Sequence, residues 1–91
     1  MTKVSKRIDF SNKFNKNLKK APLSIKIALR KRMEIFVIDP FAPILNNHGL
    51  TGEYKGYRSI NIITGDWRAI YSEYPDRIVF EELGTHSQLY K

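Results

Sequence analysis

Residues 57–83 read YRSINIITGDWRAIYSEYPDRIVFEEL, and this pattern predicts the centre of the fold. It contains runs rich in branched and aromatic residues, which favour extended backbone. The predicted strands are residues 57–63, 67–74 and 77–83. Turn signals separate the runs, at Thr64, Gly65, Pro75 and Asp76. Two short turns joining three consecutive strands predict an antiparallel meander.

Side chains alternate along the first of these strands, so successive residues point to opposite faces of the sheet. Arg58, Ile60 and Ile62 share one face, and the two isoleucines indicate the face that packs against other elements. Ser59 and Asn61 fall on the other face. We therefore expect that second face to be partly open and to present these two polar side chains.

The sequence before the meander predicts a short strand and a first helix. Residues 4–10 form the strand, and Ser11 is a plausible N-cap because its hydroxyl can accept a free amide of the first turn. The helix over residues 11–20 is indicated by Phe10, Phe14 and Leu18, which recur every four residues. Its lysines lie mostly off that apolar face.

A second helix begins beside Pro22 and ends near Asp39 and Pro40, because the residue before a proline avoids helical backbone. Its apolar stripe is formed by Ile25, Leu29, Met33 and Phe36. Residues 40–56 are rich in Pro and Gly and form a predicted loop, and residues after Gly84 form a predicted tail.

The order strand, helix, helix and three strands predicts one α+β domain over residues 1–91. In this two-layer β-α-α-β-β-β arrangement, an N-terminal strand and a basic helical hairpin pack on a twisted antiparallel sheet. The chain has no cysteine, which excludes disulfides and thiolate chemistry. It has no run of about 20 apolar residues and no apolar signal segment, so we expect a cytoplasmic protein without membrane contact.

The charge of the chain is concentrated in its first third. The net charge is +7, yet residues 1–33 hold eleven Lys and Arg against one acidic residue, whereas residues 34–91 hold five basic and eight acidic residues. A basic segment of this kind indicates a polyanionic or acidic partner. A solvated lysine face that aids solubility is the plainer interpretation, and charge alone does not separate the two.

Two histidines, His48 and His86, fall just outside the predicted strands. Histidine exchanges protons near neutral pH, so a pair can serve as the acid and base that cleave RNA without a metal. Arg58 is a candidate to offset charge on the phosphorane, because a guanidinium matches phosphate oxygens. Aromatic residues that can stack an unpaired base are Tyr57, Trp67 and Tyr90.

Each of these residues also has a structural interpretation. A loop histidine is often a surface residue, Arg58 can pair with an acid such as Glu81 or Asp66, and Trp67 can fill the core. No metal-ligand spacing, P-loop, dinucleotide fingerprint or nucleophile elbow is present in the sequence. We therefore predict no metal site and no cofactor.

Three separated blocks carry a resemblance to a known family: HGLTGEYKGYR at 48–58, DWRAIY at 66–71 and GTHSQLY at 84–90. In order and spacing the chain resembles the YafQ-like branch of the RelE/ParE toxin superfamily, over nearly its whole length. The resemblance implies the toxin of a type II toxin–antitoxin pair with a helical hairpin on a twisted sheet. It also implies a ribosome-dependent endoribonuclease that cleaves translated mRNA through attack by the ribose 2′-hydroxyl, without a metal.

By position, the resemblance implies catalytic roles for His48, Asp66 and His86, with Tyr90 where the family has a C-terminal aromatic residue. Ser59 and Asn61 stand where YafQ-like sites often carry an Asp and a His. Neither can replace those groups in proton transfer, but both can hydrogen-bond a phosphate or hydroxyl. The predicted substrate-binding set is Lys55, Arg58, Ser59, Asn61, Arg68 and Tyr90.

The implied partners are a cognate antitoxin, the ribosome with its mRNA, and operator DNA reached only through the antitoxin. Two alternatives stay open at this point. One is a ParE-like toxin that binds DNA gyrase and has no RNase activity. The other is a catalytically weakened relative that acts as a binding module.

Overall fold

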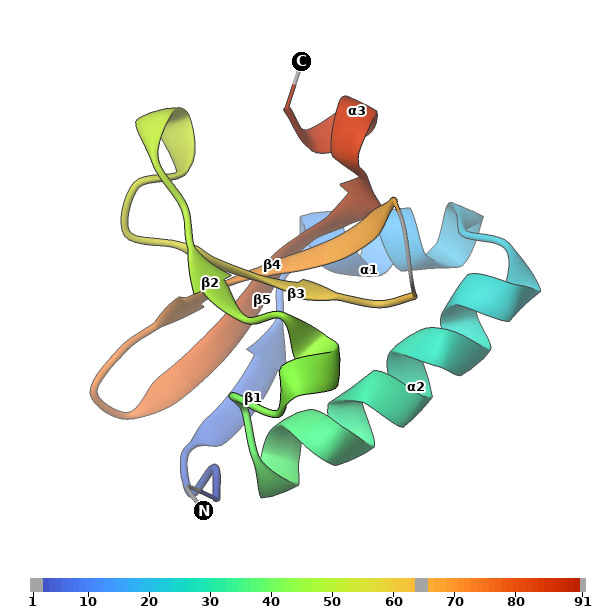
Figure 1. Cartoon of the computed structure of the whole chain (residues 1–91). Coiled ribbons are helices and arrows are strands. Elements are labelled where there is room, and N and C mark those ends of the chain that lie inside the picture. Colours follow the sequence, from blue (N-terminus) through green and yellow to red (C-terminus); the bar gives the residue numbers. More distant parts are fainter. Residues whose placement is uncertain (1–2, 64–65, 91) are drawn as a thin grey trace.

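The structure is a computed structural model that describes residues 3–63 and 66–90. Within these ranges it contains one five-stranded sheet, in the order β1-β5-β4-β3-β2. The strands are β1 (Arg7–Phe10), β2 (His48–Gly49), β3 (Arg58–Asn61), β4 (Trp67–Glu73) and β5 (Arg77–Thr85). Helices α1 (Asn12–Lys20) and α2 (Leu23–Ile38) lie on one side of the sheet (Figure 1). The predicted two-layer α+β fold is confirmed.

Strands β3, β4 and β5 form the predicted meander, since each pairs antiparallel with the next. Strand β1 instead runs parallel to β5, with Phe10 opposite Phe80, so the prediction of a wholly antiparallel sheet is wrong at this edge. The reason is topological: α1 and α2 carry the chain from one edge of the sheet to the other, and β1 meets β5 only in the tertiary structure. The turn predicted at Thr64 and Gly65 lies outside the described residues.

Both helices begin where the sequence predicts. The Ser11 hydroxyl accepts from the amide of Phe14 at 3.0 Å and donates to the carbonyl oxygen of Glu81 at 2.8 Å, so this cap also ties α1 to β5. Helix α2 begins after Pro22 and ends before Asp39. Its predicted stripe is confirmed, because Ile25, Leu29 and Phe36 are buried and Met33 packs beside them.

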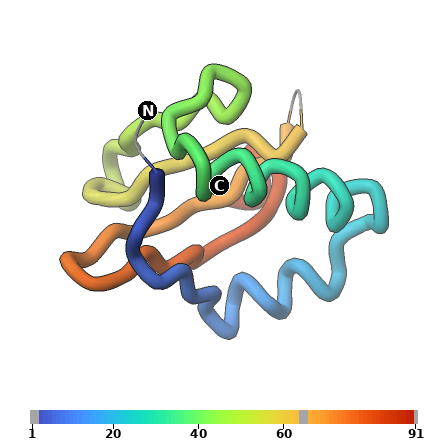
Figure 2. The backbone as a smooth tube through the Cα atoms, turned by 90° about the horizontal axis from the view of Figure 1, so that it is seen from below, coloured from blue at the N-terminus to red at the C-terminus, as the bar shows by residue number. Residues whose placement is uncertain are grey.

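The core fills the space between the helical hairpin and the sheet. Four aromatic rings form its centre, with neighbouring centroids 5.2–5.9 Å apart: Phe14, Phe36, Tyr71 and Phe80. Ile60 and Ile62 are fully buried on the same side, as the alternation predicts. Figure 2 shows α1 and α2 joined at one corner and spreading apart from there along the sheet.

The predicted loop and tail contain short elements that the sequence analysis missed. Within residues 40–56 lie the 3₁₀ turns η1 (Pro43–Leu45) and η2 (Gly52–Tyr54) and the edge strand β2. Strand β5 continues past the predicted end at Gly84 to Thr85, and a helical turn follows, α3 (His86–Leu89). No helix in the described ranges is both long enough and apolar enough to cross a bilayer.

Candidate active site

His86 lies at the junction between β5 and α3, where two sets of hydrogen bonds fix its backbone. Thr85 Oγ1 accepts from the amide of Gln88 (3.2 Å), and Gln88 Oε1 accepts from the amide of Thr85 (2.9 Å), which forms a capping box at the start of α3. The His86 amide donates to the main-chain oxygen of Asp66 at 2.9 Å and to its carboxylate Oδ1 at 3.1 Å. The His86 side chain itself is exposed.

The ring of His86 begins a chain of aromatic contacts that joins α3 to η2. It lies against Tyr90 with centroids 4.6 Å apart, and Tyr90 meets Tyr54 edge to face at 5.5 Å. Tyr54 meets Tyr57 at 6.0 Å, and the Tyr54 hydroxyl donates to the carbonyl oxygen of Leu89 at 3.2 Å. Both η2 and α3 rise from the same end of the sheet in Figure 1.

The electrostatic setting of Tyr54 favours its neutral form. Partial burial raises the pKa of Tyr54 to about 12, and the neighbouring Glu82 carboxylate adds to the rise. Glu82 pairs with Ile70, and Ile70 pairs with Ser59. Tyr54 therefore lies near Glu82 and Leu89, at the end of the sheet where β5 leads into α3.

The environment of Ser59 and Asn61 differs from the one predicted. The expectation that Ser59 faces solvent is wrong, because its side chain is 0% exposed, and Asn61 is half-buried. The physical reason is that Ser59 is flanked on both sides, by His48 of β2, which the sequence analysis took for a loop, and by Ile70 of β4. Ser59 Oγ and Asn61 Oδ1 are buried, and neither has a hydrogen-bond partner among residues 3–63 and 66–90.

His48 lies on the edge strand β2, opposite Ser59. Directly paired residues in an antiparallel ladder project to the same face, so His48 shares the face of Ser59. Its Nδ1 lies 2.8 Å from the main-chain oxygen of Asn46, and its side chain is exposed. Between His48 and the strand that leads to His86 lie β3 and β4, which places the two histidines on different sides of this face.

Arg58 lies on the other face and is held in a network of its own. Its Nε donates to Asn47 Oδ1 at 2.8 Å, and Asn47 Nδ2 donates to the Tyr71 hydroxyl at 2.8 Å. The Arg58 guanidinium lies 5.3 Å from the centre of the Phe41 ring. Burial raises the pKa of Tyr71, although Asn47 and Arg58 oppose the rise. The structure therefore brings Arg58 together with Phe41, Asn47 and Tyr71, and not with the histidines.

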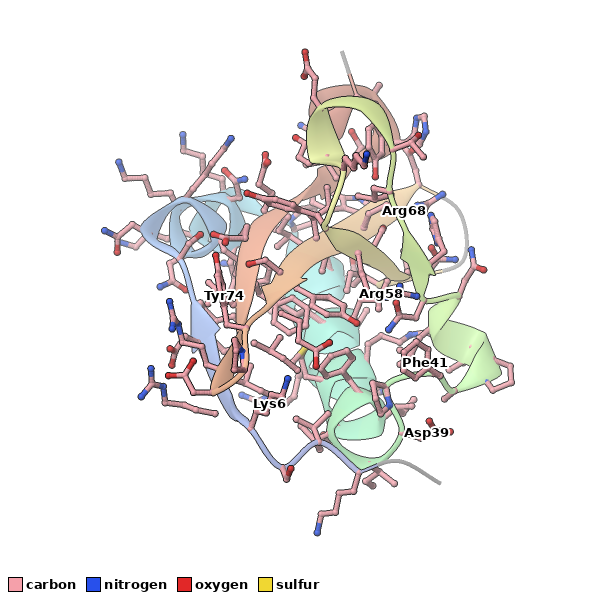
Figure 3. The ribbon with its side chains drawn as sticks, turned by 90° about the vertical axis from the view of Figure 1, so that its left-hand side faces the viewer. Lys6, Asp39, Phe41, Arg58, Arg68 and Tyr74 are labelled. Atoms are coloured by element: carbon pink, nitrogen blue, oxygen red, sulfur yellow. The ribbon has the colours of Figure 1, made fainter. Side chains whose placement is uncertain are left out.

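The remaining cations of the predicted set lie closer to α3. Arg68 pairs with Asn61 on one side and Gly84 on the other, which places it on the face of Ser59. Figure 3 looks onto this face and shows Arg68 nearer than Arg58 to the end that carries η2 and α3. Lys55 follows η2 directly and is exposed, and Tyr90 is half-buried.

The sequence analysis did not identify two residues of this region, Asn47 and Tyr54. Asn47 links three segments, since its Nδ2 also donates to the carbonyl oxygen of Pro40 at 2.8 Å. Tyr54 stands in the block at 48–58, but no spacing indicates that its hydroxyl reaches Leu89. The described residues contain no group of three or more His, Asp and Glu arranged to hold a metal ion.

The fold and this site define a class: a small α+β domain with a helical hairpin on one face of a mixed sheet and an exposed histidine anchored at the end of that sheet. The family described as "Bacterial toxin of type II toxin-antitoxin system, YafQ" matches residues 6–91. The chain belongs to this YafQ family, which confirms the resemblance drawn from its three sequence blocks.

Individual proteins show the same likeness. The mRNA interferase toxin YafQ of Escherichia coli K12 is 29% identical over 91 residues, covering 96% of this chain and 98% of that protein. The crystal structure of YafQ from E. coli BL21(DE3) has 26% identity and a TM-score of 0.75, covering 96% and 100% of the two chains. The toxin in the E. coli DinJ–YafQ complex has 27% identity and a TM-score of 0.70, covering 97% and 100%. A YoeB/ParE toxin from Agrobacterium tumefaciens shares the fold at 15% identity, with a TM-score of 0.70 and coverage of 88% and 98%.

Proposed function

We propose that this toxin is an mRNA interferase, an endoribonuclease that cleaves mRNA on the translating ribosome in the cytoplasm and is neutralised by a cognate antitoxin. The observation that carries the proposal is the exposed imidazole of His86, whose backbone is fixed by Asp66 and whose ring lies against Tyr90. The name of the E. coli relative, mRNA interferase toxin, supports the activity. The complex of YafQ with DinJ supports an antitoxin partner.

The reaction needs one group that takes a proton and one that gives it. The base removes the proton of a ribose 2′-hydroxyl, the 2′-oxygen attacks the adjacent phosphorus, and the bond to the departing 5′-oxygen breaks as that oxygen receives a proton from the acid. The products are a 2′,3′-cyclic phosphate and a 5′-hydroxyl. The bonds and protons of this reaction balance without a metal ion or a cofactor.

We assign the base to His48, a role that requires its imidazole and that of His86 to approach the same phosphodiester across β3 and β4. A carbonyl oxygen can only accept a hydrogen bond, so His48 Nδ1 supplies the hydrogen of its contact with Asn46, and Nε2 is the ring nitrogen left to face the substrate. His86 then serves as the acid that protonates the 5′-oxygen, and Tyr90 supports its ring. In this assignment Asp66 positions the backbone of His86 and transfers no proton.

The other predicted residues serve the phosphate and the nucleotide. Arg68 and Lys55 supply positive charge on the face of the histidines, whereas Arg58 acts through the network with Asn47. Ser59 and Asn61 do not titrate in the accessible pH range, so they accept or donate hydrogen bonds only. The buried Ser59 Oγ and Asn61 Oδ1 have no hydrogen-bond partner among the described residues, which leaves them available to a substrate group that reaches them.

The basic helices give the domain a means of docking on ribosomal RNA. Exposed cations on α1 and α2 include Lys13, Lys16, Lys19, Lys20, Lys26, Arg30 and Lys31. Contacts of such residues with phosphates position a protein without reading sequence. Operator DNA is reached through the antitoxin only.

The test is translation in vitro, followed by mapping of mRNA ends in the presence of the wild type, His86→Ala and the control Asp76→Asn. Asp76 lies in the exposed β4–β5 turn, away from the site. We expect cleavage by the wild type and the control, and a loss of roughly 10²–10⁴-fold in His86→Ala. Intact mRNA together with inhibited gyrase supercoiling would favour the ParE-like alternative, and normal growth of cells that express the chain alone would favour the binding module.

A further inference from the structure

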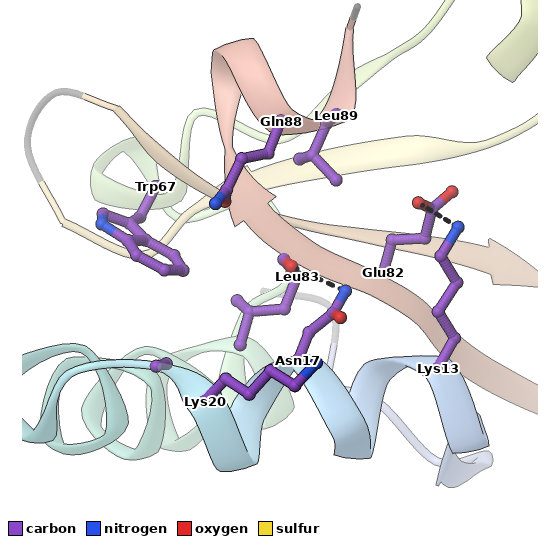
Figure 4. Close-up of a pocket in the computed structure, with 9 residues that line it drawn as sticks. Lys13, Asn17, Lys20, Trp67, Glu82, Leu83, Gln88 and Leu89 are labelled. Atoms are coloured by element: carbon purple, nitrogen blue, oxygen red, sulfur yellow. Dashed lines mark hydrogen bonds and ion pairs between the residues drawn. The ribbon is translucent and has the colours of Figure 1, made fainter.

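A second concave surface lies beside the site, between α1, the end of β5 and α3 (Figure 4). It is a crevice of about 410 Å³, within the range of roughly 300–1,000 Å³ that is typical of small-ligand sites. The residues that define this α1–α3 crevice are Asn17, Lys20, Trp67, Leu83, Gln88 and Leu89. None of them belongs to the predicted catalytic and substrate-binding sets, although Trp67 was among the aromatic residues that can stack a base and Lys20 is among the exposed cations of α1.

Trp67 forms one end of the α1–α3 crevice. It is the single tryptophan of the chain, it is half-buried, and it packs against the edge of the core. Figure 4 shows its ring beside Gln88, with Asn17 and Lys20 on the side of α1. A tryptophan used only to fill the core would be covered on both faces, whereas a half-buried indole in a crevice offers a surface on which a base can stack.

The polar groups of the α1–α3 crevice are held in fixed directions. Asn17 Nδ2 donates to the carbonyl oxygen of Leu83 at 3.0 Å, which leaves Oδ1 as an acceptor. Gln88 Oε1 accepts from the Thr85 amide at 2.9 Å, which leaves its amino group as a donor. At the other end Lys13 pairs with Glu82 at 2.9 Å, and exposed Lys20 adds a positive charge. An aromatic wall, an amide donor, an amide acceptor and a cation together suit a nucleotide.

The α1–α3 crevice is also adjacent to the proposed reaction. Trp67 pairs across the β4–β5 ladder with Thr85, the residue before His86. Asp66, the residue before Trp67, binds the His86 amide. The α1–α3 crevice and the backbone of His86 therefore lie at the same end of the β4–β5 ladder.

We propose that the α1–α3 crevice binds a nucleotide that flanks the cleaved phosphodiester, with the base stacked on Trp67 and a phosphate beside Lys20. This inference rests on the proposed function, because it treats RNA as the substrate. An acidic peptide segment is the competing occupant. The aromatic wall and the two oriented amides favour the nucleotide, since they match a base and its edge.

The test uses Trp67 itself as the reporter. Because the chain has one tryptophan, fluorescence excited at wavelengths that its five tyrosines barely absorb reports on the α1–α3 crevice. We titrate the full chain with 2′-O-methyl RNA trinucleotides, which bind but cannot be cleaved because they lack the 2′-hydroxyl. Saturable quenching is the expected result. A polyglutamate peptide is titrated in parallel, and quenching by the peptide but not by the trinucleotides would overturn the proposal.

Matched variants separate a bound nucleotide from diffuse charge. Lys20→Ala should weaken the binding of the trinucleotide by about 3-fold or more at low salt. Lys19 is an exposed neighbour on α1 outside the crevice, and Lys19→Ala should change the affinity little. Equal losses in the two variants would overturn the proposal. Trp67→Leu should lose roughly 10-fold in affinity for the trinucleotide, measured by the anisotropy of a labelled trinucleotide. If that variant folds poorly, the comparison of Lys20→Ala with Lys19→Ala still tests the proposal.

Failure of the nucleotide-binding proposal can be distinguished from failure of the proposed mRNA cleavage. Cleavage of ribosome-bound mRNA without any quenching would reject the crevice and leave the mRNA interferase standing. Quenching that Lys20→Ala weakens, in a chain that leaves mRNA intact, would reject the nuclease and retain a nucleotide-binding crevice.

Discussion

The backbone amide of His86 is shared between two oxygen atoms of one residue, the main-chain oxygen of Asp66 at 2.9 Å and its carboxylate Oδ1 at 3.1 Å. The contact links the start of β4 to the end of β5, which are 20 residues apart in sequence. It directs the Asp66 carboxylate to the peptide group of His86 and not to its imidazole. This arrangement makes the role of Asp66 testable by a pair of substitutions.

Asp66→Asn should keep most of the cleavage activity, because the asparagine oxygen can accept the same hydrogen bond. Asp66→Ala should lose roughly 10-fold in activity and about 1 kcal/mol in the free energy of unfolding. Cleavage on ribosomes and urea denaturation of both variants provide the measurements. An Asn variant as inactive as the Ala variant would show that the carboxylate acts through its charge or its proton.

The assignment of His48 as base and His86 as acid predicts different responses to a better leaving group. His48→Ala and His86→Ala should each lower cleavage by about 10²–10⁴-fold. An mRNA that carries a bridging sulfur in place of the 5′-oxygen at the mapped cleavage site needs no proton on its leaving group. This substrate should restore cleavage by His86→Ala but not by His48→Ala. Restored cleavage by His48→Ala alone would reverse the two roles.

Arg58 is expected to contribute to stability as well as to activity. Arg58→Ala removes the donor to Asn47 and the cation over Phe41, so we expect a loss of about 1–3 kcal/mol in the free energy of unfolding. Asn47→Ala should give a similar loss, and the double variant should lose less than the sum, with a coupling of roughly 0.5 kcal/mol or more. Unchanged stability in Arg58→Ala would mean that the residue serves substrate alone.

Tyr54 predicts a pH dependence of stability with a defined sign. In the folded chain Tyr54 keeps its proton up to a pKa of about 12, whereas an unfolded tyrosine ionises near pH 10. The unfolded state therefore binds fewer protons between these values, and the contribution of Tyr54 to stability falls as pH rises from about 10 to 12.

Tyr54→Phe should be less stable than the wild type near neutral pH, by about 0.5–1.5 kcal/mol, because it loses the bond to Leu89. The difference between the two proteins should shrink above pH 10, since only the wild type can ionise at this position. Urea denaturation at a series of pH values measures both effects. A constant difference up to pH 12 would contradict the protonated Tyr54 described here.

The parts of the fold that the sequence predicts are those in which neighbouring residues determine the structure. The Ser11 cap, the stripe of α2 and the alternation around Ile60 are local patterns, and each is found as predicted. The pairing of β1 with β5 and the burial of Ser59 depend on segments far apart in the chain. No periodicity specifies which edge a strand joins or which strands flank a given residue.

The candidate site shows the same division. Alternation already separated Arg58 from Ser59, and the structure places them on opposite faces. The anchoring of His86 by Asp66 and of Tyr54 by Leu89 involves contacts across 20 and 35 residues, for which the sequence carries no pattern.

The short helix α3 gives the toxin a particular route of genetic escape. His86 and Tyr90 lie beyond Leu83, the last residue of the main core cluster, so a premature stop codon or frameshift at Thr85 deletes them and leaves the densest packing in place. Because the proposed mechanism needs His86, cells under selection to survive without the antitoxin should accumulate nonsense and frameshift alleles in the codons for α3, downstream of those for the main core.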